Sequence, residues 1–453
     1  MPHTHRLSAI ALLLMTSFAH GADLLSAWQS AQTRDPALAA ARVQLEQADI
    51  RQDQARALWA PQAMASAQAG MSGQDSRLRG ADAMGQSDVS FNTNTNVGVL
   101  TRASVGAQMA WISPEKQAQA EQLALSAQVA QAQWLQAEQG LMLRTAQRYF
   151  DVLAAELTLD VLLRQQKSIQ LAAKEISKRQ SVGDASVMDV QEANARVSAM
   201  RAQVLAQENL LEMKRAAYRQ TVGNSPDKLA TLNPANVLPT AALGDVHTWV
   251  QRAKEQSPQL HLMRLQQAIQ AQEAKRIKAG DALKVDWVAQ AQLDRLMGQG
   301  KFGSSSNQMV NYVVGVQLQA PLSTGGMVQA REKEALKQVE KLRFDEEVMV
   351  LQIEQAVRDA WQRVVAAPAQ LSALEQSLKA NQQRVTATRN AHRIGSRTTN
   401  EWLGAEQDAA QAELTLLQLR IHTVLERLQL HAASGTLDSN ALQSINALLK
   451  NPS

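Results

Sequence analysis

Few residues in this sequence could do chemistry, and their spacing argues against a reaction. Of eight histidines, His247 and His261 are isolated, and His422 and His431 lie nine residues apart. That spacing does not give the close pairs that a metal site needs. The absence of cysteine removes thiol nucleophiles, disulfides and thiolate ligands together. No Ser–His–Asp set or carboxylate pair stands out either. We therefore predict no catalytic residues, no metal site, no cofactor and no enzymatic activity.

The composition favours long helices over thick globular cores. Only 4% of the 453 residues are aromatic, although 45% are hydrophobic. Aromatic side chains bury the most area per residue, so a chain this poor in them is expected to pack narrow seams of Ala, Leu and Val. Lys and Arg number 46 against 42 Asp and Glu, without a basic and aromatic cluster. We therefore expect no nucleic-acid partner.

The first residues predict export from the cytoplasm. His3, His5 and Arg6 precede an apolar run at residues 7–18, and the small residues Ala19 and Gly21 stand at positions −3 and −1 of the expected cleavage site. This order is typical of a secretory signal peptide, cut here after Gly21. The alternative is an uncleaved anchor helix, but the apolar run is too short for a bilayer about 30 Å thick.

An internal duplication organises the rest of the chain. Trp28 followed by Pro36 in the first half is matched by Trp249 followed by Pro258 in the second. A proline-containing stretch between the halves is typical of a linker. We therefore divide the chain into a signal peptide at 1–21, a first repeat at 22–223, a linker at 224–244, a second repeat at 245–437 and a short C-terminal tail at 438–453.

Each half contains one very long predicted helix, at residues 114–182 and 326–394. At 1.5 Å per residue, each would be roughly 100 Å long. Pro368 is expected to kink the second. Apolar residues spaced three and four apart, from Val190 to Val204 and from Leu414 to Leu428, indicate coiled-coil packing in the helices that follow.

Four segments alternate apolar and polar residues with period two, at residues 62–69, 103–111, 285–294 and 310–320. Gly, Ser and Asn at about 71–98 and 297–308 predict turns between them. The pattern fits strands of a transmembrane barrel with a wet lumen, or a soluble sheet packed on helices. The signal peptide and the turn segments favour the barrel. Because the smallest single-chain barrels need about eight strands, four strands require several chains to close one.

The chain resembles the TolC-like family of outer-membrane efflux and type I secretion channels over nearly its whole mature length. The resemblance depends on the duplicated helix–Pro–helix starts, the glycine turns at Gly183 and Gly395, and the step from strand to helix at residues 320–326. The first half departs from this step, because residues 111–116 lack a glycine pair. The resemblance implies an α plus transmembrane β fold: a duplicated long-helix coiled-coil α-barrel in the periplasm and a trimeric twelve-stranded β-barrel in outer-membrane lipid, with four strands per chain.

The resemblance also assigns roles to individual residues. They are a gate at Asp189, His392, Arg397 and Glu401, adaptor-docking tips at Gly183, Gly395, Ser396 and Thr398, and a barrel-to-helix turn at Pro321, Gly325 and Gly326. His392 stands where the family often has Tyr, which suggests a pH-sensitive gate. Gly404 stands where a second acid is common, which suggests a thinner ring of charge. The alternative for Arg397 and Glu401 is a local helix pair, since they are four residues apart.

The resemblance implies a passive, gated exit duct from periplasm to exterior. Its partners would be a periplasmic adaptor and an inner-membrane transporter, either of the ABC type for secretion or proton-driven for efflux. The alternative from the residues alone is a soluble periplasmic coiled-coil adaptor or structural protein. The polar strand residues suit almost any hydrated cargo, so no cargo is predicted.

Overall fold

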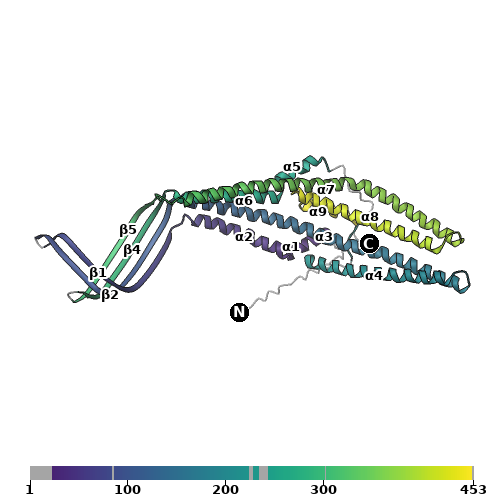
Figure 1. The fold of residues 1–453 in the computed structure, drawn as a ribbon, viewed down its shortest axis with the longest axis horizontal. Helices are drawn as coiled ribbons and strands as arrows, with labels where there is room; N and C mark the ends of the chain where they lie inside the picture. The colour runs from purple at the N-terminus through teal and green to yellow at the C-terminus, as the bar shows by residue number, and fades with distance from the viewer. Residues whose placement is uncertain (1–22, 84–85, 224–227, 234–242, 301–302, 451–453) are drawn as a thin grey trace, which may run out of the picture. The chain divides into compact units, whose positions relative to one another are not determined.

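A computed structural model describes residues 23–450, apart from 84–85, 224–227, 234–242 and 301–302 (Figure 1). The predicted signal peptide and most of the predicted linker lie outside these residues. The helices of the first half are α1 (Leu24–Arg34), α2 (Pro36–Ala57), α3 (Pro114–Ser181) and α4 (Val187–Val222), and those of the second half are α5 (Val246–Gln256), α6 (Pro258–Lys278), α7 (Met327–Arg393) and α8 (Thr399–Ala433). The same order in both halves confirms the duplication.

Proline sets the start of three of these helices. Pro36, Pro114 and Pro258 are the first residues of α2, α3 and α6, where the missing proline N–H costs no helical hydrogen bond. The two long helices end within a residue of their predicted ends. Helix α7 continues through Pro368, and the kink expected there stays a prediction.

The contacts divide the chain into two compact units that do not follow the predicted repeats. One unit combines the described residues up to 42, 134–260 and from 349 onward, and the other combines 43–133 and 261–348. Each unit therefore draws on both repeats. The duplication describes how the sequence is organised, whereas packing joins equivalent pieces of the two halves.

The second unit contains an antiparallel sheet of β1 (Gln62–Ala83), β2 (Gln86–Ile112), β4 (Lys284–Gly300) and β5 (Gly303–Gln319), in the order β1-β2-β4-β5. The strands begin near the predicted positions but are much longer. The predicted turns at 71–98 and 297–308 were wrong in extent, because both stretches lie mostly in strands. Their Gly, Ser and Asn residues are poor strand formers alone, but the ladder to a neighbouring strand continues through most of them and supplies hydrogen bonds on that side.

The two faces of the sheet differ as the alternation predicted. On one face Arg102 pairs with Asp294 (Nε–Oδ1, 2.7 Å), and the Ser66 and Ser104 hydroxyls lie 2.8 Å apart. The opposite face exposes large apolar side chains along β2, β4 and β5: Val105, Trp287, Val310, Tyr312, Val314, Val316 and Leu318. Trp111 stacks on Trp287 with ring centroids 5.5 Å apart. The outer strands β1 and β5 each pair on one side only within the described chain.

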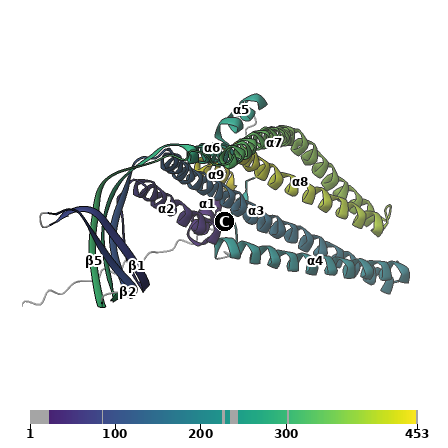
Figure 2. The same ribbon diagram turned by 60° about the vertical axis from the view of Figure 1, so that its left-hand side comes forward.

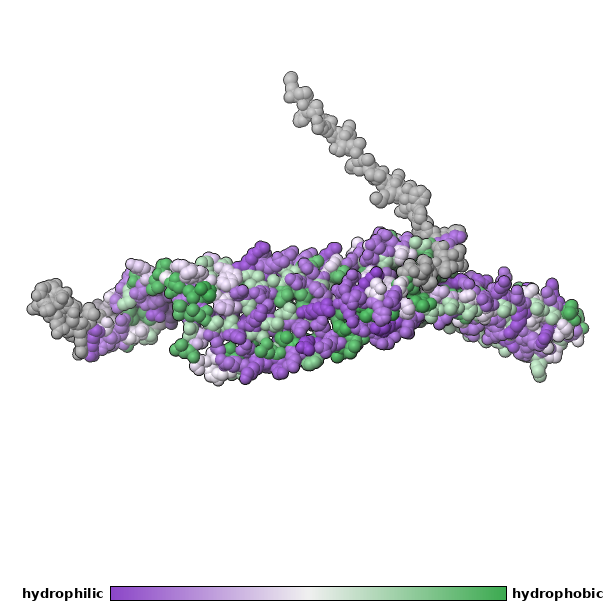
Figure 3. Space-filling model, turned by 90° about the horizontal axis from the view of Figure 1, so that it is seen from above, coloured by the Kyte–Doolittle hydropathy of each residue, from purple (hydrophilic) through white to green (hydrophobic). Residues whose placement is uncertain are grey.

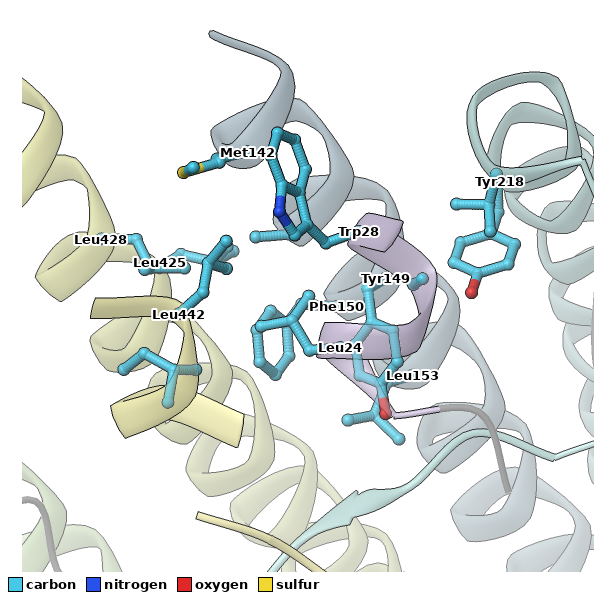
Figure 4. Close-up of a cluster of buried hydrophobic side chains, with 14 of the residues drawn as sticks. Leu24, Trp28, Met142, Tyr149, Phe150, Leu153, Tyr218, Leu425, Leu428 and Leu442 are labelled. Atoms are coloured by element: carbon cyan, nitrogen blue, oxygen red, sulfur yellow. The ribbon is translucent and has the colours of Figure 1, made fainter. Parts of the chain in front are cut away.

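The first unit has an aromatic-centred core (Figure 4). Leu24 and Trp28 of α1 pack with Tyr149 and Phe150 of α3 and Leu428 of α8. Residues of the predicted C-terminal tail belong to this core. They form α9 (Ser439–Asn446), whose buried side chains are Ala441, Leu442 and Ile445, and β6 (Leu449–Lys450), which pairs with β3 (Thr231–Leu232). Sequence reasoning did not foresee that this short tail is packed in the core, where its three buried apolar residues dock the short helix.

Two helix pairs, α3–α4 and α7–α8, turn back at their ends in Figures 1 and 2. Among the described helices, none combines the length and apolar character needed to cross a membrane.

Candidate gate at the helix turns

The turns after α3 and α7 have the same backbone construction. Gly183 and Gly395 have φ of 81° and 74°, a conformation that favours glycine. In the first turn the N–H groups of Gly183 and Asp184 donate to carbonyls of the preceding helix, and Gly395 and Ser396 do the same in the second. These paired bonds are a Schellman motif, which satisfies the last carbonyls of a helix. Both glycines therefore lie in the turns, and their role as docking tips stays a prediction.

The helices that leave the turns begin with matching capping boxes. The Ser186 hydroxyl accepts from the Asp189 N–H, while the Asp189 carboxylate accepts from the Ser186 N–H at 3.0 Å. Thr398 and Glu401 make the same exchange at the start of α8, with the Thr398 N–H at 2.8 Å from the carboxylate. Each box satisfies two helix-end donors reciprocally. Sequence reasoning missed both boxes, although a Ser or Thr followed by an acid three residues later could have revealed them.

Two of the predicted gate residues are therefore bound within their own turns. The Thr398 N–H, and after it the Arg397 guanidinium, lower the pKa of Glu401 to about 2. Hydrogen bonds from Ser186 lower the pKa of Asp189. Arg397 lies beside Glu401 (Nη1–Oε1, 2.5 Å), which is the local helix pair considered as the alternative. Both carboxylates stay ionised throughout the ordinary pH range.

His392 lies beneath the second turn, buried to 5% exposure. Its Nε2 is 3.0 Å from the Thr399 hydroxyl, and its ring centroid is 5.4 Å from that of Trp402. The guanidinium of Arg389 lies 5.8 Å from the Trp402 ring. His392 therefore contacts the interior of its own hairpin.

The described residues show a contact between the two hairpins that sequence reasoning did not identify. Asn400 Nδ2 donates to Glu192 Oε2 at 2.7 Å, and this bond lowers the pKa of Glu192. A buried apolar cluster also joins α8 to this hairpin: Ile169 and Ala172 of α3, Met200 and Val204 of α4, and Trp402 and Leu403 of α8. No hydrogen bond or ion pair joins Asp189 to Arg397 or Glu401 in the described part of the chain.

The step from strand to helix also has the predicted position. Residues 320–326, which include Pro321, join β5 to α7, and Gly325 and Gly326 have φ of 61° and 80°. In the first half a single residue, Ser113, separates β2 from α3, and its hydroxyl accepts from the Lys116 N–H at 3.3 Å. A serine cap followed by proline starts a helix without a glycine pair, which explains the departure in the first half.

No group of three or more metal-ligating side chains occurs among the residues that the structure describes. Gly404 lies on α8 with nothing within 4 Å of an added Cβ. Gly404 therefore adds no charge near the second turn, and the thinner ring of charge expected from the sequence stays a prediction.

A sheet with one polar and one exposed apolar face, continuous with helix pairs that end in capped turns, defines the class of outer-membrane channel proteins. The fold is that of the outer membrane channel CmeC of Campylobacter jejuni, with a TM-score of 0.74 and 13% identity, covering 94% of this chain and 90% of CmeC. The family model "Outer membrane efflux protein" matches residues 249–436. The chain is therefore similar to outer membrane efflux proteins over these residues, and its similarity to outer-membrane channels supports a location in the outer membrane.

Two relatives carry the name "Outer membrane protein TolC". The Vibrio cholerae protein is 25% identical over 324 residues, which are 72% of this chain and 74% of that protein. The Escherichia coli protein is 26% identical over 322 residues, which are 70% of this chain and 65% of that protein, just under two thirds. Channels of this family are homotrimers that work with efflux or secretion systems. These outer-membrane relatives favour an exit channel over the alternative of a soluble periplasmic adaptor or structural protein.

Proposed function

We propose that three copies of this chain form a passive, gated exit duct across the outer membrane. The observation that carries the proposal is the four-stranded sheet, with an ion-paired polar face, an exposed apolar face and two outer strands, β1 and β5, that pair on one side only. In lipid such edges must find partners, because unpaired backbone groups there cost several kcal/mol each. Joining β1 of one copy to β5 of the next in three copies satisfies every edge and gives twelve strands.

Cysteine cross-linking tests this arrangement directly, because the natural sequence contains no cysteine. We expect Ser66→Cys on β1 combined with Asn311→Cys on β5 to give disulfide-linked dimers and trimers in outer-membrane fractions, with neighbouring polar positions scanned to find the register. The matched control replaces Ser66→Cys by Ser104→Cys on β2, which has neighbours on both sides within one chain. Recovery as a soluble periplasmic monomer, or equal cross-linking in the control, would overturn the proposal.

The gate of this duct is proposed at the two turns, with Asp189, His392, Arg397 and Glu401. The fixed charges of Asp189 and Glu401 support a cation-favouring entrance, because their pKa values are lowered by bonds within each turn. Arg397 is exposed on 59% of its side chain, so it is free to reach a neighbouring copy as well as Glu401. Purified protein in planar lipid bilayers should show a low-conductance closed state that prefers cations.

The turns are also the proposed docking tips for a periplasmic adaptor, which couples the duct to an inner-membrane transporter of the ABC or proton-driven type. Large apolar side chains are exposed there: Val182 at 80%, Met188 at 79% and Ile394 at 82%. Hydrophobic surface is visible at this end of the helices in Figure 3. Exposed apolar groups gathered beside the predicted docking positions Gly183, Gly395, Ser396 and Thr398 suit a protein partner better than water.

A photo-crosslinking amino acid at Met188 tests the docking tips in living cells. We expect an adduct with a membrane-anchored periplasmic protein. The control site is Leu205, which is 52% exposed on α4 but lies four to five helix turns away from the tip. Equal adducts from both sites, or none from Met188, would contradict docking at the tips.

A further inference from the structure

Near the turns, the side chain of Trp402 has a buried polar atom that lacks a partner among the described residues. The side chain is 4% exposed, and its Nε1 is fully buried without a hydrogen-bond partner among the described residues. A buried donor of this kind is rare in folded proteins and calls for an explanation. Trp402 lies at the boundary between the two hairpins, in the apolar cluster with α3 and α4.

Two opposing effects meet at this side chain. The indole ring buries apolar area against the α3–α4 pair, which holds α8 to it. The indole N–H loses its bonds to water in that position and gains none, which weakens the same arrangement. Moving α8 away from α3 and α4 would expose the N–H to water and recover the loss. Separation of the hairpins therefore loses the buried contact of the ring but recovers the hydration of the N–H.

We propose that Trp402 is a positioning residue of the gate, whose ring holds the two hairpins of a chain together and whose unpartnered N–H keeps that contact easy to open. The inference rests on the proposed gated duct. Besides this ring, the described residues join the hairpins through the Asn400–Glu192 hydrogen bond and through a hydrogen bond from the Ser168 hydroxyl to the Glu406 carboxylate, with the Arg164–Glu413 pair farther from the turns. His392 and Arg389 lie against the same ring, so a movement of the ring would displace these two side chains near the second turn.

The test replaces the N–H without changing the shape of the ring. In Trp402→3-(3-benzothienyl)alanine a sulfur stands where the indole N–H was. We expect the variant channel to open less often, by about tenfold or more, because removing the penalty of one buried unpaired donor shifts an equilibrium by roughly tenfold and the proposed trimer contains three of them. The detergent-solubilised protein should also unfold at a higher temperature. Trp402→Ala, which removes the ring as well, should instead raise the closed-state conductance.

Trp249 provides a matched control in the same compact unit. It is equally buried at 4% exposure, but its Nε1 donates to the Leu243 carbonyl at 2.5 Å. The same replacement at Trp249 should lower the unfolding temperature and leave channel opening unchanged, because it breaks a bond that is made. Opening that stays the same or increases in the Trp402 isostere, or an unfolding temperature that falls as in the Trp249 control, would overturn the inference.

The two readouts separate this inference from the proposed duct. If the natural protein forms no channel, the proposed function fails, and the unfolding temperatures still report whether the Trp402 N–H carries a penalty. If the natural protein forms a channel and the Trp402 isostere behaves like it in both assays, the duct stands and the role of Trp402 is refuted.

Discussion

Arg397 gives the sharpest test of the gate, because it contacts Glu401 of its own chain in the structure, whereas its proposed gate contact is with a neighbouring copy. Within one chain it pairs with Glu401 at 2.5 Å, and both side chains are substantially exposed, at 59% and 42%. An exposed pair four residues apart on a helix changes an equilibrium by about twofold. If that were its whole role, Arg397→Ser would loosen the first turn of α8 slightly and leave the conductance of the closed channel unchanged.

A contact with a neighbouring copy predicts a larger effect. The local pair acts within its own turn and does not favour the closed form, whereas a contact between copies is lost on opening. A trimer has three such contacts, and three shifts of about twofold multiply to roughly an order of magnitude in the balance between closed and open forms. We therefore expect Arg397→Ser to raise the closed-state conductance in planar bilayers by several-fold. Glu401→Gln keeps an acceptor for the Thr398 N–H but removes the charge that pairs with Arg397. If Arg397 acts mainly on a neighbour, Glu401→Gln should have the smaller effect.

Arg384→Ser is the matched control for this experiment. Arg384 pairs with Asp408 between α7 and α8 at 2.5 Å, and its side chain is 53% exposed, so a pair of similar exposure is removed farther from the turn. Conductance that is unchanged in Arg397→Ser, or raised equally in Arg384→Ser, would refute the assignment of Arg397 to the gate. The local helix pair would then be a sufficient account of this residue.

Three further predictions follow from contacts in the first unit. Thr398→Ala should cost about 1 kcal/mol of local stability, because the N-cap of α8 is lost, and should speed proteolysis at the second turn. Burial lowers the pKa of His431, so the free energy of unfolding should be highest above the unfolded pKa near 6.5 and should fall as the pH drops below it. Thermal unfolding between pH 5 and 7 should show this fall in the natural protein and in the control His247→Gln, but not in His431→Gln. Gly435→Ala should destabilise the protein strongly, because φ is 72° and an added Cβ would lie 2.3 Å from the carbonyl oxygen at the end of α5. The control Gly404→Ala places its Cβ in open space, so it should leave the unfolding temperature unchanged or stabilise the protein by up to about 1 kcal/mol.

Much of the helical architecture could be predicted because its boundaries are local. A proline at the first position and a glycine just past the end mark α3 at Pro114 and Gly183, and both signals act through the backbone of the residue itself. Strand lengths could not be predicted in this way. The stretch at 71–98 is rich in turn residues, and its extended form depends on hydrogen bonds to a partner strand rather than on its own preferences.

The candidate site likewise contains residues that short spacings could predict and residues that they could not. The turn glycines and the acid of each capping box could be found from short spacings, since each interacts with residues three to five positions away. The bond between Glu192 and Asn400 joins residues 208 positions apart, and the burial of Trp402 depends on helices from the other half of the chain. No pattern in one segment reports such contacts, so they became visible only in the folded chain.

Local and long-range contacts would have different roles in the gate. Asp189 and Glu401 are fixed by bonds within their own turns, so their charge and position persist when the hairpins separate. They can set the charge at the entrance, but they do not sense whether it is open. The contacts that change on separation are those between hairpins, which include the Glu192–Asn400 bond, the Ser168–Glu406 and Arg164–Glu413 contacts and the cluster around Trp402. Substitutions in the capping boxes should therefore alter the stability of the turns, and substitutions between the hairpins should alter the conductance.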